Sequence, residues 1–253
     1  MNFRSAMSQF FAPGHAPLVR ATALGLVCSL LALAPPAFGA DAGASEAFDS
    51  PESAKGSRGI QATSLARAEY EVVVVQYWSL GSLLRAEAVM GGNNIVTLVD
   101  ADTYAVYDTL SNRGYRVQRS AGAKAGDAIR KRPFGMHLQE MLDQGGEKIR
   151  EEAGEGIAVD VYRVTDEQGR RTLWVRSGEA QIPIRLETYE RTQGRTGRLD
   201  WVNWLEGVEI PASFFTPPSE VVFEEIGSFE ELQIRASQAP LRPAPPFFPE
   251  LID

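Results

Sequence analysis

The chain has 253 residues, of which 25 are lysine or arginine and 33 are aspartate or glutamate, so its formal net charge is −8. Such an acidic balance argues against partners that are nucleic acids or anionic membrane surfaces. One cysteine, Cys28, and two histidines, His15 and His137, leave little room for thiol, zinc or histidine chemistry.

Residues 1–39 predict a cleavable export signal. Arg4 and Arg20 occur in this stretch without any acidic residue, and the apolar run "ATALGLVCSLLALA" follows from Ala21 to Ala34. This run is shorter than the ~17 to 25 residues of a membrane-spanning helix. We therefore expect cleavage near residue 40, a periplasmic location and no transmembrane anchor after cleavage; an uncleaved anchor is the alternative.

Removal of the signal limits the chemistry of the mature chain. Cys28 and His15 leave with it, so no disulfide, thiolate nucleophile or cysteine-based zinc site is expected. A cut after Gly39 leaves 23 basic against 33 acidic side chains, a net charge of −10. We expect no cofactor, no metal and no nucleic-acid partner.

The composition divides the rest of the chain into three parts. Residues 40–60 are small and polar and predict a flexible linker, whereas residues 61–230 have the size of one domain. Residues 231–253 end in "SQAPLRPAPPFFPELID", which is rich in proline and predicts an extended, loose tail; docking of Phe247 and Phe248 onto the domain is the alternative.

The first half of the domain predicts antiparallel hairpins. Its β-branched, aromatic and alternating segments are residues 70–78, 94–100, 103–108 and 115–120. Turn signals separate them at "SLGS", "GGNN" and "DAD". Asp100, Asp102 and Asp108 faintly resemble a calcium loop but lack its central glycine and closing glutamate, so we interpret Asp100 and Asp102 as turn formers.

One short amphipathic helix is predicted in "RPFGMHLQEMLDQGG" (residues 132–146). Pro133 suits the first turn, and Gly145 and Gly146 suit the end. The apolar residues at helical spacing are Phe134, Leu138, Met141 and Leu142.

Strands resume in residues 157–165, 171–177, 182–191 and 197–205. In "IPASFFTPPSEVVF", Pro217 and Pro218 exclude a central strand, so Phe214 or Phe215 is expected to seal one margin of the sheet. The predicted class is mainly β with a few helices: a highly curved antiparallel sheet, or unclosed β-barrel, covered by a helical lid.

No catalytic arrangement emerges from the sequence. His137 lies between Met136 and Leu138 in the predicted helix, where a histidine at the edge of the buried face explains it best. A single histidine cannot complete a serine triad of the usual kind, and no glycine-rich phosphate loop occurs. We predict that the protein is not an enzyme.

Apolar and aromatic side chains are the conspicuous feature of the domain. A curved sheet with one helix against it predicts a hydrophobic cavity on its concave side, and an ordinary core is the alternative. The candidate lining residues are Val73, Val75, Tyr77, Leu98, Tyr104, Val106, Phe134, Leu138, Met141, Leu142, Trp174, Leu186, Trp201 and Phe214.

Several motifs resemble those of the LolA/LolB-like superfamily of periplasmic lipoprotein carriers. By this resemblance the chain looks like a divergent member of that superfamily. The motifs are "YWSLGSLLRAEAV", "NNIVTLVDADTYAVYD", "RPFGMHL" and "SFFTPPSEVVFEE", between Glu69 and Glu225. The resemblance implies an unclosed barrel that handles acyl chains. In the carriers an arginine soon after the strand tryptophan fastens the lid, but Trp78 is followed by Ser79 to Ser82.

Two functions follow as hypotheses. The first is a monomeric periplasmic protein that binds acyl chains of lipoprotein or lipid, in outer-membrane lipoprotein sorting and biogenesis or in envelope lipid handling. The alternative is an envelope-stress or regulatory module with a protein partner, for which the proline-rich tail would be the docking peptide.

Overall fold

The structure is a computed structural model that describes residues 58–67, 72–90, 92–154, 156–178, 180–238, 241, 243 and 248–253. The predicted export signal and nearly all of the predicted linker lie outside these residues. The first strand begins at Arg58, at the end of the segment expected to be linker.

The described residues form one sheet with three α-helices. The strands are β1 (Arg58–Arg67), β2 (Val72–Leu80), β3 (Leu83–Met90), β4 (Asn93–Val99), β5 (Thr103–Asp108), β6 (Arg113–Gln118), β7 (Glu147–Gly154), β8 (Ile157–Thr165), β9 (Gly169–Arg176), β10 (Pro183–Glu190), β11 (Arg195–Glu209) and β12 (Val222–Ile226). The helices are α2 (Ala121–Asp127), α3 (His137–Asp143) and α4 (Phe229–Gln238), with 3₁₀ helices η1 (Ala212–Phe215) and η2 (Pro249–Leu251).

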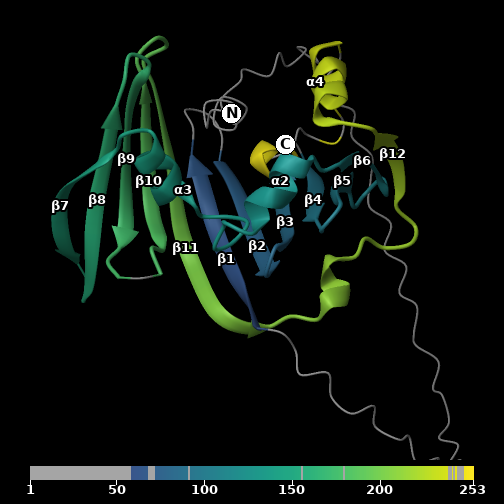
Figure 1. Cartoon of the computed structure of the whole chain (residues 1–253), viewed down its shortest axis with the longest axis horizontal. Coiled ribbons are helices and arrows are strands. Elements are labelled where there is room, and N and C mark those ends of the chain that lie inside the picture. Colours follow the sequence, from purple (N-terminus) through teal and green to yellow (C-terminus); the bar gives the residue numbers. More distant parts are fainter. Residues whose placement is uncertain are drawn as a thin grey trace, which may run out of the picture. The chain divides into compact units, whose positions relative to one another are not determined.

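The strand order in the sheet is β12-β6-β5-β4-β3-β2-β1-β11-β10-β9-β8-β7, so the two ends of the order do not meet. Every neighbouring pair is antiparallel except β12 and β6, which are parallel. The predicted class, an unclosed and mainly antiparallel β structure with a few helices, is confirmed. Figure 1 shows the helices on the concave side of the curved sheet.

Alternation in the strands decides which side chains face the helices. In β2, Val73, Val75 and Tyr77 are buried, whereas Val72 and Val74 are exposed by 62% and 46%. Because successive side chains of a strand point to opposite faces, one face of β2 joins the core and the other lies outside. The predicted turn at Asp100 is also present, since its Oδ1 accepts hydrogen bonds from the backbone N–H groups of Asp102 and Thr103 at 2.8 and 2.7 Å.

Two separate apolar clusters lie on the concave face. The larger joins β1–β6 to α4 and to the C-terminal residues Leu251 and Ile252. The smaller joins α3 to β8, β9 and β10. Figure 1 shows the same division, with α3 next to β8–β10 and with α2 and the C-terminus next to β2–β4.

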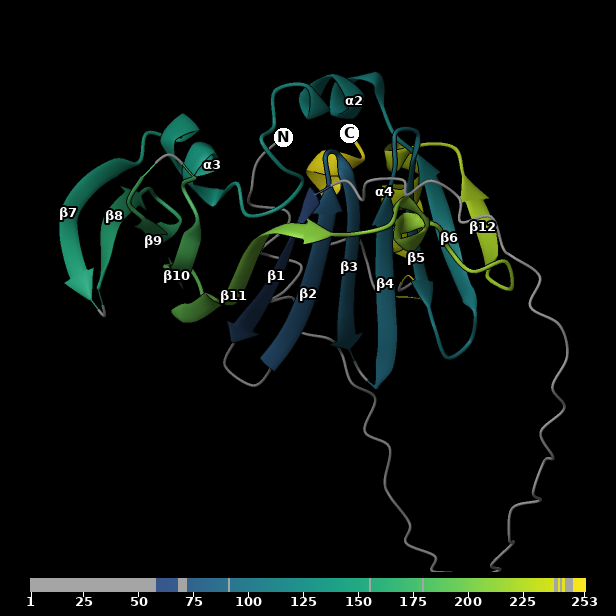
Figure 2. The same cartoon turned by 90° about the horizontal axis from the view of Figure 1, so that it is seen from below.

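The segment between β11 and β12 crosses the outer face of the sheet (Figure 2). Phe214 in η1 packs edge-on against Trp78 of β2, with 5.3 Å between ring centroids, and its carbonyl accepts a hydrogen bond from Arg85 of β3 at 3.0 Å. This crossing delivers β12 to the far edge, parallel to β6. The structure therefore differs from the expected margin seal, because Phe214 covers strands from outside.

The lid helix is shorter than predicted, because α3 begins at His137 and Phe134 precedes it. Gly135 has a φ of +70°, and a Cβ there would lie 2.9 Å from the Trp204 ring, so the chain bends where a helical turn was expected. Gly145, with a φ of +79°, ends the helix as predicted. The helix α4 was missed, although Ser228 caps its start: the Ser228 hydroxyl accepts from the Glu231 N–H at 3.1 Å, and the Glu231 carboxylate accepts from the Gly227 N–H at 2.9 Å.

Candidate functional site

Seven of the predicted lining residues meet on the concave face of β1–β6. Six are at least 95% buried in the larger cluster, and the seventh, Trp201 of β11, packs against it. The six are Val73, Val75, Tyr77, Tyr104, Val106 and Phe134.

The chain's own C-terminal segment fills this face. Leu251 and Ile252 are 1% and 0% exposed, and Phe248 packs against the same cluster. The Phe248 ring meets the Tyr77 ring edge-on at 5.9 Å between centroids, and its backbone N–H donates to the Tyr104 hydroxyl at 3.4 Å. The end of the chain is therefore a core element, which differs from the loose tail expected from its prolines.

Arg119 clamps the C-terminal segment. Its side chain has no exposed surface; its Nε donates to the Leu251 carbonyl at 2.6 Å, and two of its nitrogens donate to the Asp127 carboxylate at 2.8 Å. The backbone N–H of Ser120 donates to the Ile252 carbonyl at 2.7 Å, and Arg130 donates to the Glu250 carbonyl at 2.6 Å. These bonds satisfy backbone acceptors that burial would otherwise leave without partners.

An aromatic group adjoins the C-terminal segment on the concave side. Tyr77 stacks on Phe134 with 5.0 Å between centroids, and Trp201 lies 5.1 Å from Tyr77 and 5.4 Å from Trp204. Arg132 lies 4.8 Å above the Trp204 ring and donates to the carbonyls of Phe134 and Gly135. We call Tyr77, Phe134, Trp201 and Trp204 the aromatic group.

The smaller cluster holds three more predicted lining residues. Leu138 and Met141 of α3 and Leu186 of β10 are 5%, 3% and 1% exposed, and they pack together. Leu142, predicted on the same helix face, is 41% exposed. The bend at Gly135 explains why Phe134 joins the larger cluster while Leu138 and Met141 join the smaller one.

The structure does not bring the last three predicted residues to the concave face. Leu98 packs with Val96, Ala105 and Tyr107 on the other face of β4 and β5. Trp174 alternates with the buried Leu173 and Val175 of β9; its indole N–H donates to Glu152 at 3.2 Å, and Arg185 lies 5.6 Å above its ring. Phe214 covers Trp78 from outside, as described above.

Polar groups of α3 are buried beside the aromatic group. Burial, and next the charge of Arg132, lowers the pKa of His137 to about 4, and the His137 ring lies 6.0 Å from the Trp201 ring. Burial, and next the charge of Glu250, raises the pKa of Glu140 to about 8. Burial also raises the pKa of Tyr77 to about 12, and its hydroxyl lies 3.1 Å from the Ser64 hydroxyl.

Two buried polar atoms of this region have no hydrogen-bond partner among the described residues, namely Trp201 Nε1 and Glu140 Oε2. A buried donor or acceptor without a partner costs about 1 to 3 kcal/mol, so such atoms commonly pair with water or a bound molecule. With its pKa at about 8, Glu140 is largely protonated at neutral pH and can donate as well as accept.

The described residues contain no group of three or more His, Cys, Asp or Glu side chains that could hold a metal ion. None of their helices is both long enough and apolar enough to cross a bilayer.

Comparison with known proteins gives similar folds at low identity. No family model matches the chain, and no curated protein matches its sequence. Solved structures similar to it include a conserved protein from Thermus thermophilus, at 13% identity over 67% of this chain and 91% of that one, with a TM-score of 0.48.

Two further solved structures are similar to this chain at 14% and 15% identity. One is a domain of a proposed outer-membrane lipoprotein-sorting protein from Vibrio parahaemolyticus, at 14% identity over 64% of this chain and 91% of that one, with a TM-score of 0.31. The other is the MucA/MucB complex of Pseudomonas aeruginosa, at 15% identity over 67% of this chain and 59% of that one, with a TM-score of 0.34.

Sequence reasoning left docking of Phe248 open only as an alternative, and it did not predict the burial of Leu251 and Ile252 or their clamp. A signal for this was present in "FFPELID", where Leu251 and Ile252 are apolar. Arg119 carried no such signal, because its partners Asp100, Asp127 and Leu251 lie 19, 8 and 132 residues away.

Proposed function

We propose that this chain is a periplasmic protein that binds an acyl chain of a lipid or lipoprotein on its concave face, in outer-membrane lipoprotein sorting or lipid handling. The observation that carries the proposal is the aromatic group together with the unpartnered Trp201 Nε1. Aromatic rings provide apolar area for an alkyl chain, and a buried N–H provides a donor for an ester or amide carbonyl.

The energy of such binding would come from burial of the alkyl chain, about 0.8 kcal/mol for each CH₂ group removed from water. Phe248, Leu251 and Ile252 already fill part of the concave face. An acyl chain therefore either lies beside them, along the aromatic group, or takes their place. No covalent step is required.

The test is analysis of whatever co-purifies with the chain. We expect native mass spectrometry and solvent extraction to find a bound lipid, at up to one molecule for each protein chain. The Trp201→Ala variant should lose this lipid. Trp174→Ala is the matched control, because it removes the same side chain from the outer face of the sheet.

Thermal unfolding of both variants separates loss of ligand from loss of fold. A wild-type chain that is reproducibly free of lipid would overturn the proposal. So would equal loss of lipid from folded Trp201→Ala and Trp174→Ala proteins.

The alternative function, partner docking through the proline-rich tail, faces an energetic obstacle. Residues 248–253 would have to leave the clamp of Arg119, Ser120 and Arg130 before a partner could bind them. An acyl chain that lies along the aromatic group makes no such demand, because the aromatic group lies beside the segment.

A further inference from the structure

The outer face of the sheet carries a row of charged residues from β1 to β8. Direct cross-strand pairing places Arg67 opposite Arg198, Arg198 opposite Glu187, Glu187 opposite Thr172, and Thr172 opposite Arg163. These residues alternate with the buried ones that face α3, such as Leu173 and Leu186. The row therefore lies on the face opposite to the proposed acyl site.

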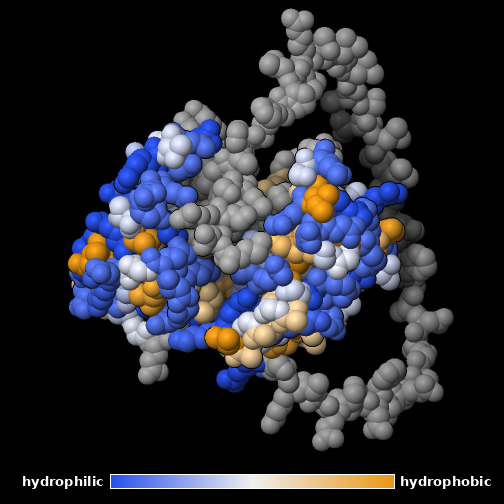
Figure 3. All heavy atoms as spheres, turned by 45° about the horizontal axis from the view of Figure 1, so that its top comes forward, coloured by the Kyte–Doolittle hydropathy of each residue, from blue (hydrophilic) through white to orange (hydrophobic). Residues whose placement is uncertain are grey.

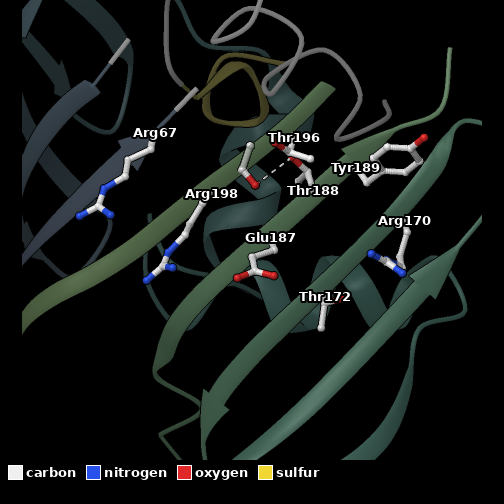
Figure 4. A pocket seen from close by; sticks show the side chains of 9 residues that line it. Arg67, Arg170, Thr172, Glu187, Thr188, Tyr189, Thr196 and Arg198 are labelled. Carbon is white, nitrogen blue, oxygen red and sulfur yellow. Dashed lines mark hydrogen bonds between the residues drawn. The ribbon is translucent and has the colours of Figure 1, made fainter. Parts of the chain in front are cut away.

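An open groove of about 390 Å³ lies along this row (Figure 4). In Figure 4 the guanidinium groups of Arg67 and Arg198 lie on one side of Glu187, and Arg170 lies on the other. The groove is lined by Arg67, Arg170, Thr172, Glu187, Thr188, Tyr189, Thr196, Gly197 and Arg198.

The charges in the groove are not balanced within the described part of the chain. Arg198 pairs with Asp200 at 2.7 Å, but no described carboxylate lies within ion-pair distance of Arg67 or Arg170. Among the described residues, two lining arginines without an ion-pair partner, Arg67 and Arg170, therefore share the groove with one lining carboxylate, that of Glu187. The groove differs in the sign of its charge from the chain as a whole, which has a net charge of −8.

The pairing of Arg67 with Arg198 is unfavourable by itself. Like charges directly opposite each other on neighbouring strands destabilise a sheet. An anion between or beside the two guanidinium groups removes this repulsion, and guanidinium groups bind phosphate and carboxylate through pairs of N–H donors.

Hydroxyl groups complete the set of donors. Thr172, Thr196 and Tyr189 line the same groove, and their hydroxyls can donate to an oxyanion. The groove spans β1, β11, β10 and β9, which is three strand spacings or about 14 Å. An open groove of this width fits phosphate groups presented side by side on a surface better than one enclosed small ion.

We propose that this arginine groove is a binding site for phosphate groups, either those of anionic phospholipid headgroups or free phosphate. A binder of acyl chains would gain from such a site, since it would hold the outer face of the chain against a membrane. The site is independent of the acyl proposal, because no residue of the aromatic group lines it.

The test measures binding of the chain, purified in the form in which cells produce it, to lipid vesicles. Vesicles of phosphatidylcholine with phosphatidylglycerol are compared with vesicles of phosphatidylcholine alone, and inorganic phosphate is titrated separately by calorimetry. We expect binding to the anionic vesicles that weakens with added salt. The Arg67→Gln/Arg170→Gln double variant should bind about 25-fold more weakly, or about fivefold for each arginine.

Matched variants make the test specific to the groove. Arg58→Gln/Arg113→Gln removes the same charge from arginines of β1 and β6 that do not line the groove, and it should bind as the unaltered chain does. Glu187→Gln removes the one lining carboxylate and should strengthen binding.

The outcomes distinguish headgroup phosphate from free phosphate, and they distinguish both from the absence of a phosphate site. Binding to anionic vesicles without a response to millimolar phosphate assigns the site to headgroups, and a response to phosphate assigns it to the free ion. Absence of both would overturn the proposal, as would equal weakening by the control double variant. Binding of poly-glutamate as tight as that of the anionic vesicles would overturn the preference for phosphate.

Discussion

The two apolar clusters of the sheet are filled in different ways. Over β1–β6, the covering side chains come from segments far along the chain, namely Phe134, Leu232 and Leu251. Over β8–β10, the covering side chains come from the seven-residue helix α3, which immediately precedes β7. The first cluster is closed by long-range contacts with buried polar clamps, and the second by a short local element.

This difference indicates that the two regions differ in how easily they open. Long-range contacts with satisfied buried hydrogen bonds open only when much of the structure unfolds, whereas a short helix held by a few apolar contacts can open locally. Figure 3 shows hydrophobic residues in a few groups among mostly hydrophilic ones on the face in view.

The largest expected effect is on the clamp of the first region. Arg119→Met leaves the Leu251 carbonyl without its Arg119 donor and leaves the Asp127 carboxylate with Arg130 alone, at 3.0 Å. Loss of one member of a buried ion pair costs about 3 to 5 kcal/mol, and we expect the lower end because Arg130 remains. Arg116→Met is the control, because its pair with Glu225 is 31% and 60% exposed and contributes about 1 kcal/mol or less. Chemical denaturation measures both, and similar losses for the two variants would contradict the clamp.

Leucine-to-alanine substitutions compare the two clusters directly. Leu251→Ala and Leu138→Ala each remove a side chain that is at least 95% buried, for which about 2 to 5 kcal/mol is usual. We expect Leu251→Ala near the upper end, because its surroundings are fixed by Arg119 and Ser120. We expect the loss of unfolding free energy for Leu138→Ala to lie near the lower end, because α3 can move toward the sheet and fill the space. A larger loss for Leu138→Ala than for Leu251→Ala would contradict this comparison.

The second region should also carry an unusual pH dependence. Glu140 has a pKa of about 8 in the folded chain against 4.5 as its ordinary value, so between these the folded state binds more protons than the unfolded state. Stability must therefore fall as the pH rises from 4.5 to 8, by at most about 1.4 kcal/mol per pH unit for this proton.

His137 acts in the opposite direction over part of that range. Its pKa of about 4 lies below the ordinary 6.5, so between pH 4 and 6.5 the unfolded state binds the extra proton and stability rises with pH. The contribution of Glu140 is thus clearest between pH 6.5 and 8. Glu140→Gln should flatten the unfolding free energy there, and an unchanged slope would show that Glu140 does not hold its proton.

The sequence predicted the open sheet and most of one face because those features are local. Period-two alternation in "VVVVQYW" and "TYAVYD" places Val73, Val75, Tyr77, Tyr104 and Val106 on a common face, and all five are buried there. Turn formation at Asp100 is likewise decided within a few residues.

Features that depend on long-range contacts were not predictable from pattern. The prolines near the C-terminus indicated an extended tail, whereas Pro249–Leu251 form the 3₁₀ helix η2, which packs on the concave face of the sheet, and nothing local says where that segment docks. The faces of Leu98 and Trp174 depend on strand parity, and a shift of one residue moves a side chain to the other face. The arginine groove was hidden because net charge averages over all faces of the molecule.

The smallest expected effect concerns the exposed side of α3. Leu142 was predicted to line the cavity with Met141, but it is 41% exposed whereas Met141 is 3% exposed. Leu142→Ser should change the unfolding free energy by less than about 0.5 kcal/mol, as is usual for surface positions. Met141→Ser, one residue earlier, should cost several times more because it places a hydroxyl in the smaller cluster.

The same pair tests where an acyl chain would lie. If it lies along the aromatic group, Leu142→Ser keeps the co-purified lipid, because the Leu142 side chain belongs to neither cluster. If Leu142→Ser loses lipid while keeping its stability, then α3 turns its exposed side to the ligand in the loaded state. That result would move the acyl site from the aromatic group to the helix and would make α3 the part that opens.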